Sequence, residues 1–344
     1  MAKKHSWIAL QAQRDDWLSK VQEPVVDPER EIVDPHHHLW DRENALYELD
    51  QFWADTETGH KVVQTVFVEC GESYRTEGPD HLHPVGETEY VAAMAKASEA
   101  DPSRATIAGI VSHADLRGNR LDEALDAHEA AGQDLFRGIR HSGAYETEED
   151  ILTIPPRGAH GLYADPAFRQ GLAKLGERGL TYDTWHFHHQ IADFRALAEA
   201  VPGTTLVMDH FGTPLGVGHY AGKRQEIFER WKDDVAAVAE CPNVIAKLGG
   251  MAMPDNGYGW HERDLPPTSD EFVEAQAPWY HHTIACFGPE RCMFESNFPV
   301  DRASISYPVL WNGLKKIAAA YSQEAQEAMF CGTARRVYRL TSPA

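Results

Sequence analysis

The sequence has little cysteine, little positive charge and no long apolar run. Its five cysteines lack CxxC spacing, a pattern typical of reduced thiols that disfavours a disulfide framework or a zinc–cysteine site. Only 32 basic side chains stand against 53 acidic ones, and the formal net charge of −21 repels phosphate backbones and anionic lipid. No apolar stretch reaches the roughly 18 residues that span a bilayer, and the N-terminus has no signal-peptide pattern. We therefore expect a cytoplasmic protein that binds neither nucleic acid nor membranes.

Residues 1–31 differ from the rest of the chain. They are charged and modestly amphipathic, with apolar side chains that include Trp7, Trp17 and Leu18. We predict a helical extension that packs on the outside of the protein and offers a surface for a homodimer. Residues 32–344 contain no fixed-period repeat and no low-complexity tract, and we expect them to form one domain.

Short apolar or β-branched runs alternate with longer segments of helical period along that domain. The strand candidates are residues 31–40, 62–70, 105–116, 136–143, 180–188, 204–212, 243–253 and 292–300. The helix-like segments are residues 86–100, 119–132, 165–179, 191–203 and 224–241. Because each parallel strand needs a crossover, usually helical, this alternation predicts a (β/α)8 TIM barrel. An open, doubly wound sheet is the alternative.

Two insertions, residues 71–85 and 254–272, are rich in glycine, proline and aromatic side chains. Both follow the carboxyl end of a predicted strand, the face on which barrel enzymes carry their active sites. We interpret each insertion either as a lid over a substrate or as an irregular oligomer contact.

Ionisable side chains gather near the carboxyl ends of the predicted strands. They include His36, His38, Glu69, His113, Arg140, His141, His186, His188, Asp209, His210 and Glu295. Alternate residues of a strand share a face, so we expect Asp34, His36 and His38 to point into the barrel. His37, between them, would face the helices. Burying so many ionisable groups is costly unless they pair or hold a ligand, and their convergence predicts a functional cleft.

Four of these runs resemble, in order, the motifs of one enzyme family. The quoted stretches are "DPHHHLW" (D-x-H-x-H-x-W, first strand), "FRGIRHS" (G-x-R, fourth strand), "LVMDHFG" (D-H-x-G, sixth strand) and "MFESNFPVD" (G-S-D-W-P, final strand). They span residues 32 to 301. The chain thus resembles the amidohydrolase-related (amidohydrolase 2) family of TIM-barrel hydrolases. Within it, the chain is most similar to a lactonase-like branch with sugar-acid lactonases, 2-pyrone-4,6-dicarboxylate lactonase and 4-sulfomuconolactone hydrolase.

The resemblance implies roles for the matching residues. His36, His38 and His210 would bind a divalent metal, zinc or manganese, or would line the site of a metal-free lactonase, with His210 polarising the substrate carbonyl. Arg140 would bind a substrate carboxylate, which its planar fork suits. Other side chains at strand ends or in the loops are further candidates for substrate contact: Glu69, Tyr74, His141, Trp185, His188, Tyr258 and Trp260.

The last motif departs from the family pattern. Asn297 stands where the family has an aspartate as general base, and an amide cannot take a proton from water. Glu295 lies two residues earlier, on the same face, and Asp301 lies just beyond. Our hypothesis is that Glu295 or Asp301 activates water while Asn297 orients the substrate. The alternative is that Glu295 only pairs with a buried arginine or with Lys247.

Asn297 also removes the usual anionic metal ligand, for which Glu69 or Asp34 could substitute, so mechanisms with and without metal both stay open. We expect no organic cofactor. The resemblance implies a hydrolase that opens a lactone or cyclic ester of a small, anionic, carboxylated metabolite. The alternatives are a metal-dependent decarboxylase of an aromatic acid and a catalytically decayed barrel used for binding.

Overall fold

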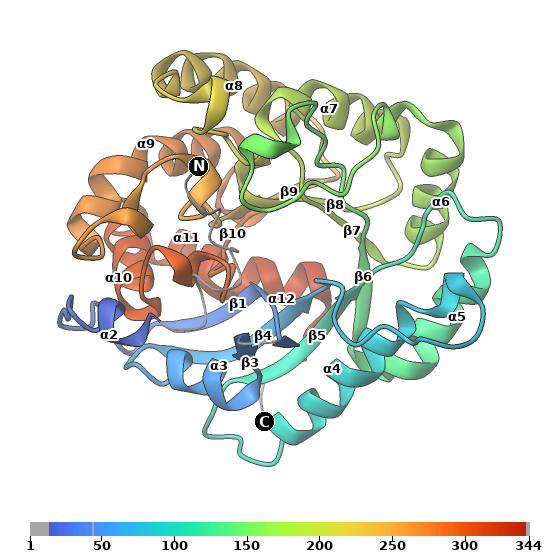
Figure 1. The fold of residues 1–344 in the computed structure, drawn as a ribbon, viewed down its shortest axis with the longest axis horizontal. Helices are drawn as coiled ribbons and strands as arrows, with labels where there is room; N and C mark the ends of the chain where they lie inside the picture. Colours follow the sequence, from blue (N-terminus) through green and yellow to red (C-terminus); the bar gives the residue numbers. More distant parts are fainter. Residues whose placement is uncertain (1–13, 43–44, 342–344) are drawn as a thin grey trace.

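A closed barrel of parallel strands forms the centre of the computed structural model, which describes residues 14–42 and 45–341 (Figure 1). The strands follow one another around the barrel in chain order: β1 Glu31–His37, β4 Lys61–Val68, β5 Thr106–Ser112, β6 Phe136–Arg140, β7 Thr181–Thr184, β8 Leu206–Met208, β9 Val244–Leu248 and β10 Cys292–Phe294. Beyond β10, Phe298 O accepts a 2.8 Å hydrogen bond from His38 N and so closes the ring onto β1. The predicted (β/α)8 barrel is confirmed. The doubly wound alternative is wrong, because its strand order would reverse partway across an open sheet.

Helices surround the barrel on all sides (Figure 1). The five segments predicted as helical form α4 Val85–Ser98, α5 Leu121–Gly132, α6 Pro166–Glu177, α7 Ile191–Ala200 and α8 Arg224–Ala239. The outer ring also contains α3 Leu49–Thr56, α9 Ser269–Phe287 and α10 Tyr307–Ala318. A capping box begins α9: Thr268 N donates to Glu271 Oε2 at 2.8 Å, and Glu271 N donates to Thr268 Oγ1 at 3.2 Å. The predicted insertion 254–272 therefore ends at Thr268.

The helix α12 Thr333–Tyr338 fills the amino-terminal end of the barrel (Figure 1). Its Ala334, Val337 and Tyr338 pack in one cluster with inward-facing strand residues, among them Val33 and Ile245. The amino-terminal half of the barrel therefore has a largely apolar core. The polar side chains gather above it, at the carboxyl ends of the strands.

A bulge in β1 changes which side chains point inward. The pairing of β1 with β4 shifts register between Asp34 and His37. His36 and His38 point into the barrel as expected, and His37 stacks outside on Phe52 with ring centroids 4.2 Å apart. Asp34, however, faces outward and accepts a 3.0 Å hydrogen bond from Tyr307 Oη on α10. The prediction that Asp34 shares the inward face is wrong, because a bulge breaks the two-residue period.

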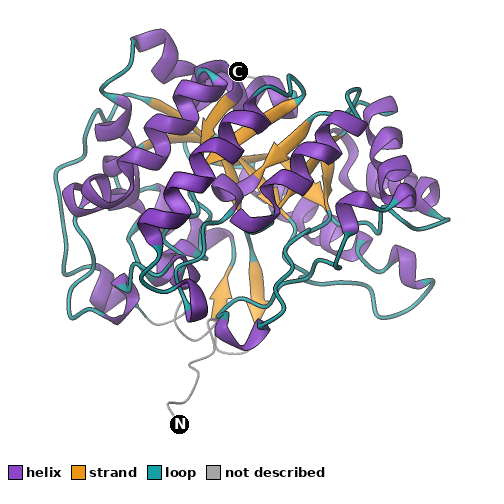
Figure 2. Cartoon of the chain, turned by 90° about the horizontal axis from the view of Figure 1, so that it is seen from above, coloured by secondary structure: helices purple, strands orange, loops and turns teal. Residues whose placement is uncertain are grey.

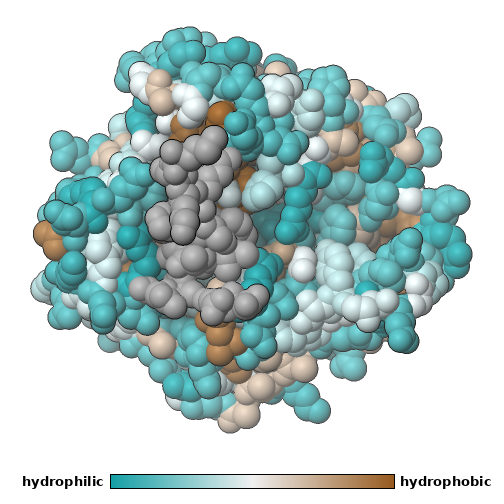
Figure 3. Space-filling model, viewed as in Figure 1, coloured by the Kyte–Doolittle hydropathy of each residue, from teal (hydrophilic) through white to brown (hydrophobic). Residues whose placement is uncertain are grey.

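The carboxyl-terminal face carries a small hairpin of β2 Trp40–Arg42 and β3 Ala45–Tyr47, which stands apart from the barrel strands (Figure 2). It brings Trp40 and Arg42 over the barrel mouth. Seen from this face, the molecular surface is mostly hydrophilic (Figure 3), in keeping with the excess of acidic side chains.

The predicted N-terminal helix is present only in part. Residues 1–13 lie outside the described residues. From residue 14 onward the segment contains the short helix α2 Asp15–Leu18 and then continues without helix to β1. Its Glu23 accepts a 2.7 Å hydrogen bond from Ser269 N at the start of α9, and Val26 N donates to Asn312 Oδ1 on α10 at 2.8 Å. None of the helices formed by the described residues has the length and apolar character needed to cross a bilayer.

Candidate active site

A pocket of about 390 Å³ opens at the carboxyl end of the strands. Six residues predicted for the site line it: His38, Glu69, Arg140, Trp185, His210 and Asn297. They come from strand ends or from the turns that follow, as expected for a barrel enzyme. The predicted convergence of imidazoles, acids and Arg140 on one place is therefore present.

Glu295 lies beneath the pocket and joins two histidines. Its Oε1 is 2.7 Å from His210 Nδ1, and its Oε2 is 2.8 Å from His36 Nδ1. Burial opposes ionisation of Glu295, but the imidazoles of His210 and His36 outweigh it and lower its pKa to about 2. In return, Glu295 raises the pKa of His210 against the effect of burial. Glu295 is fully buried and outside the pocket lining, so its carboxylate faces His210 and His36 rather than the pocket.

His210 sits in a strained turn after β8. Its φ is 54° and that of Phe211 is 59°, within a run of left-handed residues that turns the imidazole towards Glu295. Gly250, just beyond β9, makes room for the ring, since a Cβ at that position would lie 2.0 Å from His210 Nδ1. Gly250 itself has φ +67°, a conformation that favours glycine.

His38 presents the second imidazole of the pocket. Its Nδ1 is 2.7 Å from Val68 O, and because a carbonyl only accepts, Nδ1 carries the proton. Burial and the neighbouring Arg140 guanidinium hold the pKa of His38 well below its usual value. His38 is therefore neutral, and its Nε2 lone pair is the atom available to a ligand.

Arg140 is anchored from behind by Glu69. Its Nε donates to Glu69 Oε1 at 2.9 Å, and a second nitrogen donates to the Glu69 carbonyl. The same guanidinium lies 3.3 Å from His36 Nε2, which must then be the acceptor. Burial disfavours the charge of Arg140, but Glu69 and Asp209 outweigh it and raise its pKa. A fixed, permanently charged fork thus faces the pocket.

Asn297 and Asp301 form a pair on the opposite side. Asn297, with φ 56°, donates from Nδ2 to Asp301 Oδ1 at 2.9 Å, and Ala252 N donates to the other oxygen at 3.0 Å. Burial raises the pKa of Asp301 to about 7. Asn297 lines the pocket but the fully buried Asp301 does not, so Asp301 contacts the Asn297 amide from behind.

The remaining wall was not predicted from the sequence. Apolar contacts come from the hairpin, from the loops after β6 and β9, and from the turn after β10: Trp40, Ile154, Pro155, Met253 and Val300. Two further cations, Arg42 and Arg157, reach the same space. The sequence did not predict these residues, because side chains in loops follow no hydrophobic period that would show which way they point.

A second cavity adjoins the pocket and shares Glu69, Gly71, Ser142 and Arg157 with it. Tyr74 and His141 line this neighbouring cavity rather than the pocket itself. Both therefore lie near the site, and only an elongated ligand would contact them.

Three predicted substrate contacts lie elsewhere. Trp260 packs in the core near Phe272, and Tyr258 stacks on Trp260 at 4.8 Å. His188 accepts a 3.2 Å hydrogen bond from Leu215 N and lines a different cavity. β7 ends at Thr184, so the alternating strand pattern no longer orients His188. The insertion that carries Tyr258 and Trp260 packs against the N-terminal segment, where Arg14 donates to His261 O, and does not cover the pocket.

A buried lysine lies below the histidines. Lys247 Nζ is 2.8 Å from Asp183 Oδ2, 3.2 Å from Asp209 Oδ1 and 3.3 Å from His36 Nδ1. All four side chains are fully buried. Burial disfavours the ammonium, but Asp183 and Asp209 outweigh it and raise the pKa of Lys247. The ammonium is therefore a permanent charge of the site.

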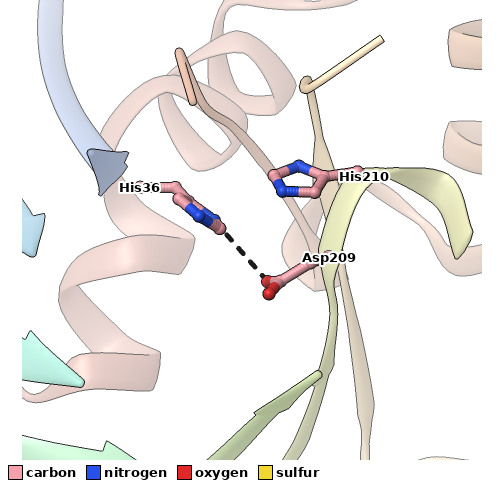
Figure 4. A group of neighbouring side chains, drawn as sticks. All are labelled: His36, Asp209 and His210. Atoms are coloured by element: carbon pink, nitrogen blue, oxygen red, sulfur yellow. Dashed lines mark ion pairs between the residues drawn. The ribbon is translucent and has the colours of Figure 1, made fainter. Parts of the chain in front are cut away.

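The described residues contain one histidine–acid group of metal-binding dimensions: His36, Asp209 and His210, whose ligand atoms lie within 4.8 Å of one another (Figure 4). The predicted ligand His38 is outside this group. A divalent ion does not fit among these side chains as they stand. The Lys247 ammonium is 3.2 Å from Asp209 and 3.3 Å from His36 Nδ1, and so stands against two of the three groups. An ion about 4 Å from an ammonium is repelled by several kcal/mol even at an effective dielectric of about 20.

The amidohydrolase family model matches residues 33–340, and the chain belongs to this family. It is similar to the uncharacterized protein y4mH of Sinorhizobium fredii, with 30% identity over 90% of this chain and 98% of the relative. It is also similar to the L-fucono-1,5-lactonase of Burkholderia multivorans, with 27% identity over 91% of this chain and 97% of that protein.

Among solved structures, an amidohydrolase of Burkholderia multivorans with bound zinc has a TM-score of 0.71 and 22% identity, over 90% of this chain and 99% of that one. Its likeness confirms the amidohydrolase barrel. The similarity to this lactonase supports the lactonase-like branch of the family, as the motifs predicted.

Proposed function

We propose that this amidohydrolase opens a lactone or similar cyclic ester of a small carboxylated molecule. The observation that carries the proposal is the pair His38 and His210, which line one pocket with their Nδ1 atoms engaged by Val68 O and Glu295. The two Nε2 atoms therefore remain for a substrate, one on a neutral ring and one on a ring whose pKa is raised. At one pH, His38 can then serve as the base and His210 as the acid.

Substrate binding would rest on the cations of the pocket. Arg140 is held by Glu69 and is nearly buried, so its interaction with a carboxylate is little screened by water. Arg42 and Arg157 add positive charge at the rim, while Trp40, Trp185 and Met253 offer an apolar surface to the ring. An anionic cyclic ester matches this combination.

In the proposed reaction, the His210 imidazolium donates a hydrogen bond to the lactone carbonyl oxygen and, with Arg140, stabilises the negative charge that develops there. A water molecule attacks the carbonyl carbon and passes its proton to His38 Nε2. The ring C–O bond then breaks, and His38 returns that proton to the leaving oxygen. The new carboxylic acid ionises and releases one proton to solvent, so the products are one carboxylate and one hydroxyl on the opened chain. Asn297 would hold the water or the substrate in place.

No metal takes part in this scheme, because the charge beside Asp209 is supplied by Lys247. The zinc or manganese implied by the family resemblance is therefore left out of the proposal. The zinc of the Burkholderia structure belongs to a protein of 22% identity and does not bear on this chain's own side chains.

The test is a panel of carboxylated and neutral lactones followed by acid release in a weakly buffered indicator assay. His38→Asn and His210→Asn should each lower kcat by about 10²-fold or more, whereas His188→Gln, on a histidine outside the pocket, should leave kcat unchanged. Equal rates for all three variants would refute the assignment. Carbon dioxide release from an aromatic acid, with no lactone opened, would indicate a decarboxylase instead.

A further inference from the structure

Lys247 is a charged group at the centre of the barrel to which the proposed reaction gives no role. It comes from β9, is fully buried and lies outside the pocket lining. An ammonium is rarely buried unless it is paired, and here two acids from neighbouring elements receive it: Asp183 on β7 at 2.8 Å and Asp209 after β8 at 3.2 Å. Two carboxylates thus pair with one buried ammonium, which indicates that its charge has a role in the site.

The lysine is anchored from below by groups that have no contact with the pocket. Asp183 accepts a 3.0 Å hydrogen bond from Thr181 Oγ1 and a 2.5 Å hydrogen bond from Tyr338 Oη on α12. These bonds hold the Asp183 carboxylate against Lys247 Nζ. The ammonium position is thus determined by the helix that plugs the barrel, not by a ligand.

The same ammonium lies against the histidine–acid group described above, the one group in the described part of the chain that has metal-binding dimensions. His36, Asp209 and His210 bring their ligand atoms within 4.8 Å. Lys247 Nζ lies 3.2 Å from the Asp209 carboxylate and 3.3 Å from His36 Nδ1. It therefore contacts two of the three groups that a cation would need.

We propose that the Lys247 ammonium takes the place of a divalent cation in this site: it neutralises Asp209 and keeps zinc out of a group that would otherwise bind it. Because Arg140 donates to His36 Nε2, the proton of His36 lies on Nδ1, which faces Glu295 Oε2 at 2.8 Å. The exclusion of zinc does not rest on the proposed function.

The test compares metal uptake by the wild type and by the double variant Lys247→Met/Asp183→Asn. The double variant removes one buried positive and one buried negative charge together, so it avoids the unpaired buried acid that Lys247→Met alone would leave. Both proteins are dialysed against zinc chloride, and bound zinc is measured by elemental analysis. We expect one zinc ion per chain in the double variant and no stoichiometric zinc in the wild type. Adding Asp209→Asn to the double variant should abolish that binding.

Zinc bound by the wild type and lost in His36→Gln would overturn the proposal, as would a folded double variant that takes up no zinc. Zinc that persists after Asp209→Asn would also count against it, because the ion would then lie elsewhere. If the double variant does not fold by near-UV circular dichroism, cobalt(II) titration of the wild type decides: absence of ligand-field bands supports the proposal, and bands that disappear in His36→Gln refute it. No readout uses a substrate, so a failed lactonase assay leaves this test intact.

Discussion

Replacing Glu295 by glutamine probes the centre of the site, because that carboxylate holds both His36 and His210 through its two oxygens. Its pKa is lowered to about 2 from a usual 4.5. A group whose pKa is depressed on folding stabilises the protein above its unfolded pKa, and this stabilisation is lost as the pH falls from about 4.5 towards 2. The shift corresponds to about 3 kcal/mol at neutral pH, and Glu295→Gln should lose stability of this order.

Glu295→Gln should lower kcat as well as stability. The amide of Glu295→Gln carries no charge, so the pKa of His210 would fall and its imidazolium would be lost at a lower pH. We expect kcat to drop by about 10²- to 10⁴-fold, the range seen when the orienting acid of an imidazole is removed. The alkaline limb of the pH profile should also move to lower pH.

The assay is lactone hydrolysis measured from pH 5 to 9, together with urea unfolding. Asp34→Asn is the matched control, because Asp34 is equally buried and bonded to Tyr307 and Ser296 but faces away from the pocket. It should leave the alkaline limb where it is. A Glu295→Gln enzyme within about tenfold of wild-type kcat, with the limb unmoved, would refute the role given to the His210–Glu295 pair.

Three further outcomes are expected. Arg140→Lys removes the planar fork that bonds Glu69, so KM for a carboxylated lactone should rise about 10²-fold while KM for a neutral lactone changes little; equal changes for both would argue against carboxylate binding by Arg140. Gly250→Ala puts a methyl group 2.0 Å from His210 Nδ1 at φ +67°, and thermal unfolding with activity assays should show a loss of about 1–3 kcal/mol and of most turnover. Dialysis against a chelator should leave kcat unchanged, since Lys247 already neutralises Asp209; activity lost to the chelator and restored by zinc would contradict the metal-free scheme.

Much of the fold was accessible from residue pattern alone. The alternation of short β-branched runs with helical segments predicted all eight strands, because a parallel strand and its crossover helix each leave a local hydrophobic period. Motif order placed His38, Arg140 and His210 at one end of the barrel. The outward turn of Asp34 and the place of His188 could not be predicted, since the first depends on a bulge and the second on where β7 stops.

Local sequence patterns could not predict which buried charged side chains pair with one another. Glu295 and His210 are 85 residues apart, and Lys247 and His36 are 211 apart. Whether a buried carboxylate serves as a base or as a support depends on which atoms stand within 3 Å of it, and these come from different strands.

The barrel, and the gathering of imidazoles, acids and Arg140 at the carboxyl ends of its strands, follow from periods within single segments and so can be derived from the residue order. The contacts of Glu295 with two histidines, and the place of Lys247 beside Asp209, depend on how the strands come together. Hydrogen bonds and charge pairing act between strands distant in the chain, so their partners are chosen by barrel closure rather than by neighbouring residues.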